Sequence, residues 1–177
     1  IESFSAAAKE RFRAAISFAV ETSAFEFTQF LNVIFGNISL KPGIVIEDIM
    51  LPQRFAANFS GPRFGVSGLR AILNVHDRPL IASAIKPMGM DHAGFAELCT
   101  EFTRGGIDII KDDHGLSDQP FARFRERVKS CAEAVNEVNS KSGSRTLYLP
   151  NITAPFKEIL DRAYFAKEQG AGGVLIS

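Results

Sequence analysis

The stretch GGIDIIKDDH, residues 105–114, places a lysine and two aspartates directly behind an apolar run. Such a run is typical of a buried strand, here with charged residues at its carboxyl end. Because side chains alternate along a strand, Lys111 and Asp113 are expected to point to one side and Asp112 to the other. The stretch therefore predicts a strand that ends in groups able to carry chemistry, followed at once by His114.

Short apolar segments of the same kind recur on both sides of this stretch, and amphipathic segments separate them. The predicted strands are PLIASAIKP (79–87), IDIIKDD (107–113), RTLYLPN (145–151) and GGVLIS (172–177). Strands that are apolar on both faces and alternate with helices favour a parallel sheet covered by helices.

Three helices are predicted between these strands from their capping residues and apolar stripes. Their expected starts and ends are Asp91 and Gly105, Pro120 and Gly143, and Thr153–Pro155 and Gly170. In the second helix the run RFRERVK, residues 123–129, is expected to form a charged outer face whose aliphatic stems pack downward.

Two architectures fit this alternation, a doubly wound sheet and a (β/α)8 TIM barrel. A doubly wound sheet normally carries G-x-G-x-x-G after its first strand, whereas this chain has KPMGMD, residues 86–91. A barrel places chemical groups at the carboxyl ends of several strands, which is where Lys86 and Lys111 lie. We therefore favour the α/β barrel.

A complete barrel needs eight strands and about 250 residues. The 177 residues end on the fourth predicted strand and begin without a methionine. An open parallel sheet would leave an apolar edge exposed. We therefore expect only the first half of the barrel here, within a longer protein.

The residues before the barrel predict a small βαβ unit at most. FRAAISFAV, residues 12–20, and IVIEDIMLP, residues 44–52, are predicted strands. Between them, the helix that begins at Phe27 should end at Gly36 and Asn37.

Composition excludes several classes of partner and of site. Twenty basic and twenty acidic residues balance, so no electrostatic footprint for nucleic acid or an anionic membrane surface exists. No apolar run approaches the roughly 20 residues that a membrane-spanning helix needs. Cys99 and Cys131 are far apart and form no C-x-x-C pair, so neither a disulfide framework nor a zinc site is predicted. These features favour a small-molecule or protein partner and a reducing, cytoplasmic location.

Lys111 beside Asp113 allows three interpretations. The lysine can form a structural salt bridge, act as a base once burial lowers its pKa, or react with carbon dioxide to form a carbamate. A carbamate and Asp113 would give oxygen ligands suited to Mg²⁺. The spacing alone favours the salt bridge, because structural ion pairs often mimic sites.

Lys86, at the end of the first predicted strand, is the second candidate. Lysine in an apolar mouth can transfer a proton next to a carbonyl, while a lysine at a strand end often only extends its charge into solvent. Two lysines at the same end of adjacent strands favour a site.

Several ordered blocks resemble the large-chain family of ribulose-bisphosphate carboxylase/oxygenase (RuBisCO). The similar blocks are FLNVIFGN (30–37), GPRFGVSGLRAILNVHDRPL (61–80), IASAIKP (81–87), GGIDIIKDDHGLSDQPFARFRERV (105–128) and YFAKEQGAGG (164–173). The resemblance implies that residues 1–60 are the C-terminal part of a ferredoxin-like α+β domain, and that residues 61–177 are the first four βα units of the barrel.

The resemblance also implies roles for individual residues. Lys86 matches a proton-transfer lysine, Lys111 the lysine that becomes carbamylated, and Asp113 a magnesium ligand. Asn37 matches an asparagine that reaches the substrate in the neighbouring subunit's site, so a homodimer or higher homo-oligomer with shared sites is implied. The implied substrate is a phosphorylated small molecule.

Two positions depart from the carboxylase pattern. Met88 stands where carboxylases have a second lysine after the first strand, and His114 replaces a glutamate ligand. These departures make the chain similar to the RuBisCO-like proteins, which enolise substrates without fixing carbon dioxide, and leave His114 as a ligand or a proton-transfer group.

The resemblance therefore implies a magnesium-dependent enzyme that forms an enolate from a phosphorylated ketose or keto sugar acid, as an enolase, isomerase or decarboxylase. The alternative is a non-catalytic or regulatory homologue in which the lysine and aspartate form only a structural pair.

Overall fold

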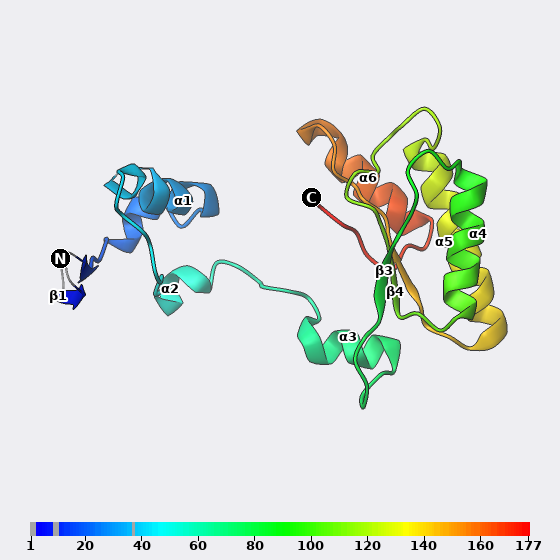
Figure 1. Ribbon diagram of the computed structural model, residues 1–177, viewed down its shortest axis with the longest axis horizontal. Helices are drawn as coiled ribbons and strands as arrows, with labels where there is room; N and C mark the ends of the chain where they lie inside the picture. Colours follow the sequence, from blue (N-terminus) through cyan, green and yellow to red (C-terminus); the bar gives the residue numbers. More distant parts are fainter. Residues whose placement is uncertain (1–2, 9–10, 37) are drawn as a thin grey trace. The chain divides into compact units, whose positions relative to one another are not determined.

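The computed structural model describes residues 3–8, 11–36 and 38–177. The chain divides into two compact units, residues 1–63 and residues 64–177, which are described separately (Figure 1). No helix in the described part of the chain is both long and apolar enough to cross a membrane.

The first unit opens with an antiparallel strand pair and continues in short helices. Strand β1 (Ser3–Ala8) pairs with β2 (Arg11–Ala15), with Ser3 opposite Ala15. The helical elements that follow are η1 (Val20–Ser23), α1 (Phe27–Phe35), η2 (Ile38–Leu40) and α2 (Gln53–Ala56). The predicted start of α1 is confirmed, while the predicted strand 12–20 persists only to Ala15.

The predicted strand 44–52 is wrong. This segment has no regular secondary structure, and Val45 and Met50 are 81% and 87% exposed. A strand needs a neighbour for its backbone hydrogen bonds, and within the described residues of this unit β1 and β2 pair only with each other. The predicted βαβ unit is therefore replaced by an antiparallel pair followed by helices.

The apolar centre of the first unit is formed by phenylalanine rings. They come from α1, from α2 and from the residues that follow α2. The Phe30 and Phe55 ring centroids lie 5.0 Å apart, and those of Phe55 and Phe59 lie 5.1 Å apart. Phe55 is almost completely buried. Tilted aromatic pairs at this spacing stabilise such a small cluster.

The second unit contains the predicted parallel sheet. Its elements are α3 (Gly65–Leu73), β3 (Ala82–Ile85), α4 (His92–Arg104), β4 (Ile109–Asp112), α5 (Phe124–Ser142), β5 (Leu147–Leu149) and α6 (Phe156–Glu168). The strand order is β3-β4-β5, with Ile85 beside Asp112 and Lys111 beside Leu149. The helix α3 was not predicted.

The fourth predicted strand, residues 172–177, is reduced to one bridge. Leu175 pairs with Asn151 in the parallel direction, and its N–H donates to the Pro150 carbonyl at 2.9 Å. The parallel α/β arrangement is confirmed, and closure of a barrel is not seen among the described residues.

The helices α4 and α5 lie side by side and cover the sheet (Figure 1). Their contact is made by buried side chains that also touch the strands, because each helix carries an apolar stripe at intervals of three and four residues. The buried members are Ile85, Phe95, Cys99, Ile110, Val128, Cys131, Val135 and Tyr148.

Helix ends agree with the sequence prediction except at the start of α5. Asp91 caps α4 by accepting a hydrogen bond from the Gly94 N–H at 2.8 Å. Gly143 ends α5 with φ 74°, a conformation that glycine adopts at low cost. The predicted start of α5 at Pro120 is wrong: the helix begins at Phe124, whose N–H donates to Asp118 Oδ1 at 2.7 Å.

Candidate functional site

The carboxyl ends of β3 and β4 bring two predicted site residues into contact. Lys86 directly follows β3 and Asp113 directly follows β4. Because these parallel strands are neighbours, their ends lie at the same edge of the sheet. Lys86 Nζ is 3.0 Å from Asp113 Oδ1. The lysine is largely exposed, whereas the carboxylate is mostly buried, so the ion pair lies at the mouth of this edge.

The surroundings of Asp113 favour its ionised form. The ammonium group of Lys86 lowers the pKa of Asp113, and a hydrogen bond from the Gly115 N–H to Oδ2 at 3.2 Å acts in the same direction. A carboxylate in this environment carries its charge throughout the neutral pH range. Asp113 can therefore hold a cation or stabilise a protonated amine.

The other two predicted groups in this segment have looser contacts. His114 is 77% exposed, and its Nδ1 lies 3.7 Å from Asp113 Oδ1. Lys111 is partly buried, and its Nζ donates to the Asp112 carbonyl at 2.9 Å. The salt bridge considered for Lys111 is formed by Lys86 instead. Asn37 lies outside the described residues.

The donor set determines whether a metal ion suits this edge. Among the described residues no group of three or more histidine, cysteine, aspartate or glutamate side chains could hold a metal. Asp113 and His114 supply two neighbouring donors, and the amine of Lys111 becomes an oxygen donor only as a carbamate. The residues fit Mg²⁺, which prefers oxygen ligands, when Lys111 carries that modification.

A buried polar network lies directly behind this edge, and sequence reasoning missed most of it. Asp112 and Arg127 are both fully buried, and Arg127 Nη2 lies 3.1 Å from Asp112 Oδ2. The Tyr148 hydroxyl donates to Asp112 Oδ1 at 2.7 Å, and the Asn151 N–H donates to Oδ2 at 2.9 Å. Burial raises the pKa of Asp112, and these charged and polar partners oppose the rise.

Arg127 was expected on the charged outer face of its helix, and that prediction is wrong. Its guanidinium is buried because it compensates the charge of Asp112. The signal was present in the spacing, since residue 127 lies three positions after Phe124 and four before Cys131, on the buried stripe of α5. The predicted alternation of Asp112 away from Asp113 is consistent with this pairing.

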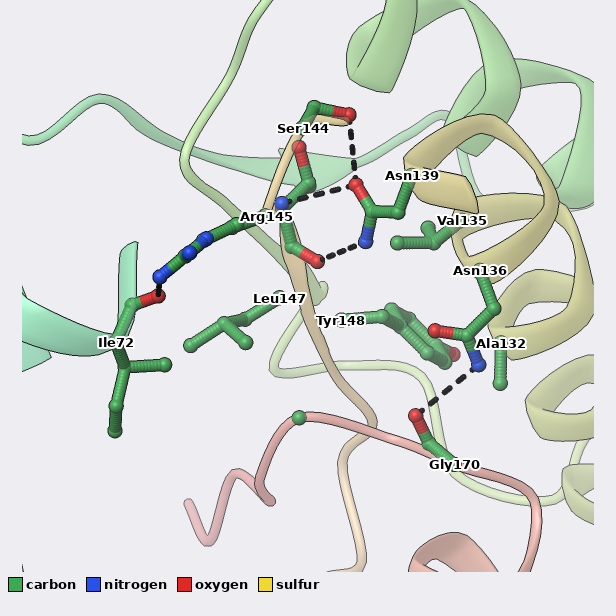
Figure 2. A pocket seen from close by; sticks show the side chains of 12 residues that line it. Ile72, Ala132, Val135, Asn136, Asn139, Ser144, Arg145, Leu147, Tyr148 and Gly170 are labelled. Carbon is green, nitrogen blue, oxygen red and sulfur yellow. Dashed lines mark hydrogen bonds between the residues drawn. The ribbon is translucent and has the colours of Figure 1, made fainter. Parts of the chain in front are cut away.

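A separate pocket of about 260 Å³ lies at the opposite, amino-terminal end of β5, between α5 and the segment around Gly170 (Figure 2). Its polar groups are bonded to each other: Asn139 Nδ2 donates to the Thr146 carbonyl at 2.9 Å, and Asn136 Nδ2 donates to the Gly170 carbonyl at 3.3 Å. Carboxylates, lysines and histidines are absent from its described lining. The pocket is therefore a weaker candidate than the edge that carries Lys86 and Asp113.

Comparison with protein families finds one match, which covers almost the whole of the second unit and about two thirds of the chain. Residues 65–177 match the family described as "Ribulose bisphosphate carboxylase large chain, catalytic domain". The chain is 35% identical over 178 residues to "5-methylthioribulose-1-phosphate isomerase" of Rhodospirillum rubrum, covering 100% of this chain and 48% of that protein. The chain thus spans about half the length of the curated relatives it matches.

Two solved structures are also similar to this chain. "Crystal structure of Rubisco-like protein from Rhodopseudomonas palustris" is 38% identical, with a TM-score of 0.94, and the match covers 100% of this chain and 51% of that one. "Dimeric Archeal Rubisco from Hyperthermus butylicus" is 31% identical, with a TM-score of 0.77, covering 85% and 36%.

Proposed function

The chain belongs to the RuBisCO large-chain family and is similar to RuBisCO-like proteins. We therefore propose that it is part of an enzyme that forms an enolate from a phosphorylated ketose. The favoured reaction is an isomerisation, in which a proton leaves one carbon beside a carbonyl and another proton is added at a neighbouring position. A keto sugar acid that loses carbon dioxide would give the same kind of enolate.

The observation that carries this proposal is the contact between Lys86 Nζ and Asp113 Oδ1 at 3.0 Å. In this contact the amine of Lys86, which can take up and release a proton, lies beside the negative charge of Asp113 at the edge where β3 and β4 end. As a neutral amine, Lys86 takes the proton of the C–H bond, whose electron pair forms the C=C bond of the enolate. As an ammonium, it returns the proton to carbon.

The other residues of this edge have supporting roles. Lys111 as a carbamate, Asp113 and His114 would hold Mg²⁺, which would polarise the substrate carbonyl and stabilise the negative charge on its oxygen. His114 is exposed and so also accessible for proton transfer to the substrate. Met88 offers no charge where carboxylases carry a lysine, which favours enolisation without addition of carbon dioxide.

The architecture and assembly belong to the same proposal. We assign residues 61–177 to the first four βα units of a (β/α)8 barrel and residues 1–60 to part of a ferredoxin-like α+β domain. Asn37 would reach the site of a partner subunit, so the working unit is a homodimer or a larger homo-oligomer. The similar archaeal RuBisCO from Hyperthermus butylicus is dimeric, which supports this assignment.

The alternative is a non-catalytic homologue with a structural lysine and aspartate pair. One observation favours it: the ammonium group of Lys86, 3.0 Å from Asp113 Oδ1, compensates the charge of this carboxylate. The two functions differ in what replacement of Lys86 would do, because a structural pair affects stability and a proton-transfer lysine affects turnover.

The test uses the longest natural form of the protein with 5-methylthioribulose 1-phosphate, Mg²⁺ and bicarbonate in deuterated water. Proton NMR measures both product formation and the entry of deuterium beside the carbonyl. We expect Lys86→Met to reduce both rates at least a hundredfold, while Lys129→Met, at an exposed site on α5, leaves them within twofold. Unchanged deuterium entry in Lys86→Met would exclude the proton-transfer role, and loss of stability alone would favour the structural alternative.

A further inference from the structure

The segment between β4 and α5, residues 113–119, carries two of the proposed site residues and is held from behind by buried side chains. We propose that Asn151 and Arg127 are positioning residues, which fix the backbone of this segment and thereby set where Asp113 and His114 lie relative to Lys86. The inference rests on the proposed function for its catalytic consequence, and on the contacts below for its structural part.

Asn151 forms two hydrogen bonds with the segment. Its Nδ2 donates to the His114 carbonyl at 2.9 Å and to the Leu116 carbonyl at 2.8 Å. Asn151 is itself fully buried, and its own N–H donates to Asp112 at 2.9 Å. The amide therefore ties the carbonyls on both sides of Gly115 to the last residue of β4. Because Asn151 is fully buried, a movement of the segment that broke these bonds would leave its amide donors unpaired, which is costly.

Arg127 forms a hydrogen bond with the segment one residue after Leu116. Its Nη2 donates to the Ser117 carbonyl and its Nη1 donates to the Ala122 carbonyl, both at 2.8 Å. The same guanidinium faces Asp112 at 3.1 Å. A planar guanidinium directs its donors in fixed directions, so one buried charge aligns β4, the loop and the start of α5.

Hydrogen bonds within the segment itself connect these contacts of Asn151 and Arg127 to the carboxylate of Asp113. The Leu116 N–H donates to the Asp113 carbonyl at 2.9 Å, and the Gly115 N–H donates to Asp113 Oδ2 at 3.2 Å. Leu116 is fully buried. The turn held by Asn151 is therefore the same turn that orients the carboxylate toward Lys86. Small shifts of such groups reduce turnover strongly, because reaction requires close alignment.

Tyr148 provides a matched control within the same network. Its hydroxyl donates to Asp112 Oδ1 at 2.7 Å, and no hydrogen bond between it and the described segment 113–119 is present. Tyr148→Phe thus removes one buried hydrogen bond behind the site, whereas Asn151→Ala removes the two that reach the segment. A general loss of stability affects both variants, and a loss of positioning affects only the second.

The experiment measures hydrogen exchange at the Gly115 and Leu116 amides by NMR, together with kcat and KM for the phosphorylated ketose, in the longest natural form of the protein. For Asn151→Ala we expect exchange at both amides to rise at least tenfold and kcat to fall at least tenfold, with KM changed less than threefold. For Tyr148→Phe we expect exchange and kcat to stay within twofold of the parent.

Three results would overturn the inference: equal exchange in the two variants, equal losses of kcat, or faster exchange in Asn151→Ala with unchanged kcat. If Asn151→Ala does not fold, Gln119→Ala takes its place, because Gln119 Nε2 donates to the Gly115 carbonyl at 2.7 Å and its Oε1 accepts from the Ser117 N–H at 2.8 Å. An inactive parent would refute the proposed function, and hydrogen exchange would then decide the positioning alone.

Discussion

Two aspartates at opposite ends of β4 are paired with arginines in different surroundings. Asp108, directly before the strand, accepts hydrogen bonds from the half-exposed Arg78 at 2.6 and 2.7 Å and from the Ile81 N–H at 2.8 Å. Asp112, the last residue of the strand, faces the buried Arg127. The first pair fastens the segment before β3 to the amino end of the sheet, and the second supports the loop at the carboxyl end.

The pair at Asp108 predicts a dependence of stability on pH. Arg78 lowers the pKa of Asp108 from its ordinary value of 3.8, so the charged form stabilises the fold above that value and this contribution is lost as the pH falls through the lowered pKa. We expect Asp108→Asn to lower the melting temperature by about 4 °C at neutral pH. As the pH falls below 3.8 and through the lowered pKa, the difference in melting temperature between the variant and the parent should shrink.

Thermal unfolding followed by circular dichroism between pH 2.5 and 7 measures this difference. Asp77→Asn is the control, because Asp77 is an exposed acid directly before Arg78 in the sequence. A difference between Asp108→Asn and the parent that persists undiminished at the lowest pH would contradict the assignment of the effect to charge.

At the scale of residues, the sequence carries the positions of the site groups but not their pairing. The end of each predicted strand placed Lys86 and Lys111 at one edge, and alternation separated Asp112 from Asp113. Which lysine meets Asp113 depends on the turn of residues 113–117, which is held by Asn151 from a distant strand end. Contacts between such separate segments leave no periodic signal.

At the scale of elements, the cap of α4 gives a clear prediction. Asp91 accepts a hydrogen bond from the Gly94 N–H at 2.8 Å and satisfies a donor that the helix itself cannot satisfy. We expect Asp91→Ala to lower the free energy of unfolding by about 1 kcal/mol and Asp91→Asn to change it by less than about half of that. Urea unfolding measures both; equal losses would show that the side-chain acceptor is not what matters.

The helices that were predicted well from the sequence have both a stripe of apolar residues and recognisable residues at their two ends. The helix α4 has Asp91 and Gly105 at its ends and was predicted in full. At α5 the usual preference of proline for the first helical turn pointed to Pro120, but the carboxylate of Asp118 caps the N–H of Phe124 instead. The apolar run 44–52 satisfies the strand pattern but has no strand partner among the described residues.

At the scale of the molecule, the boundary between the two units predicts where a protease cuts first. The units meet between Arg63 and Phe64, and residues 57–64 are exposed. Exposed connecting segments are the preferred sites of proteolysis. We expect limited trypsin treatment to cleave after Arg63 before it cleaves within α4 or α5, and Arg63→Gln to remove this fragment. Mass spectrometry identifies the cuts, and earlier cleavage after Arg104 or Lys129 would contradict the division.

The strand order β3-β4-β5 is also the order in which the strands are synthesised. Within this sheet β4 pairs with β3 and β5 pairs with β4, and a single helix separates the two strands of each pair along the chain. Each of these parallel pairs forms only after a loop that includes a whole helix has closed, and such non-local pairing is slow and leaves apolar strand edges exposed for longer. Because α4 packs against α5 as well as against the sheet, the core around α4 is complete only once α5 has been made.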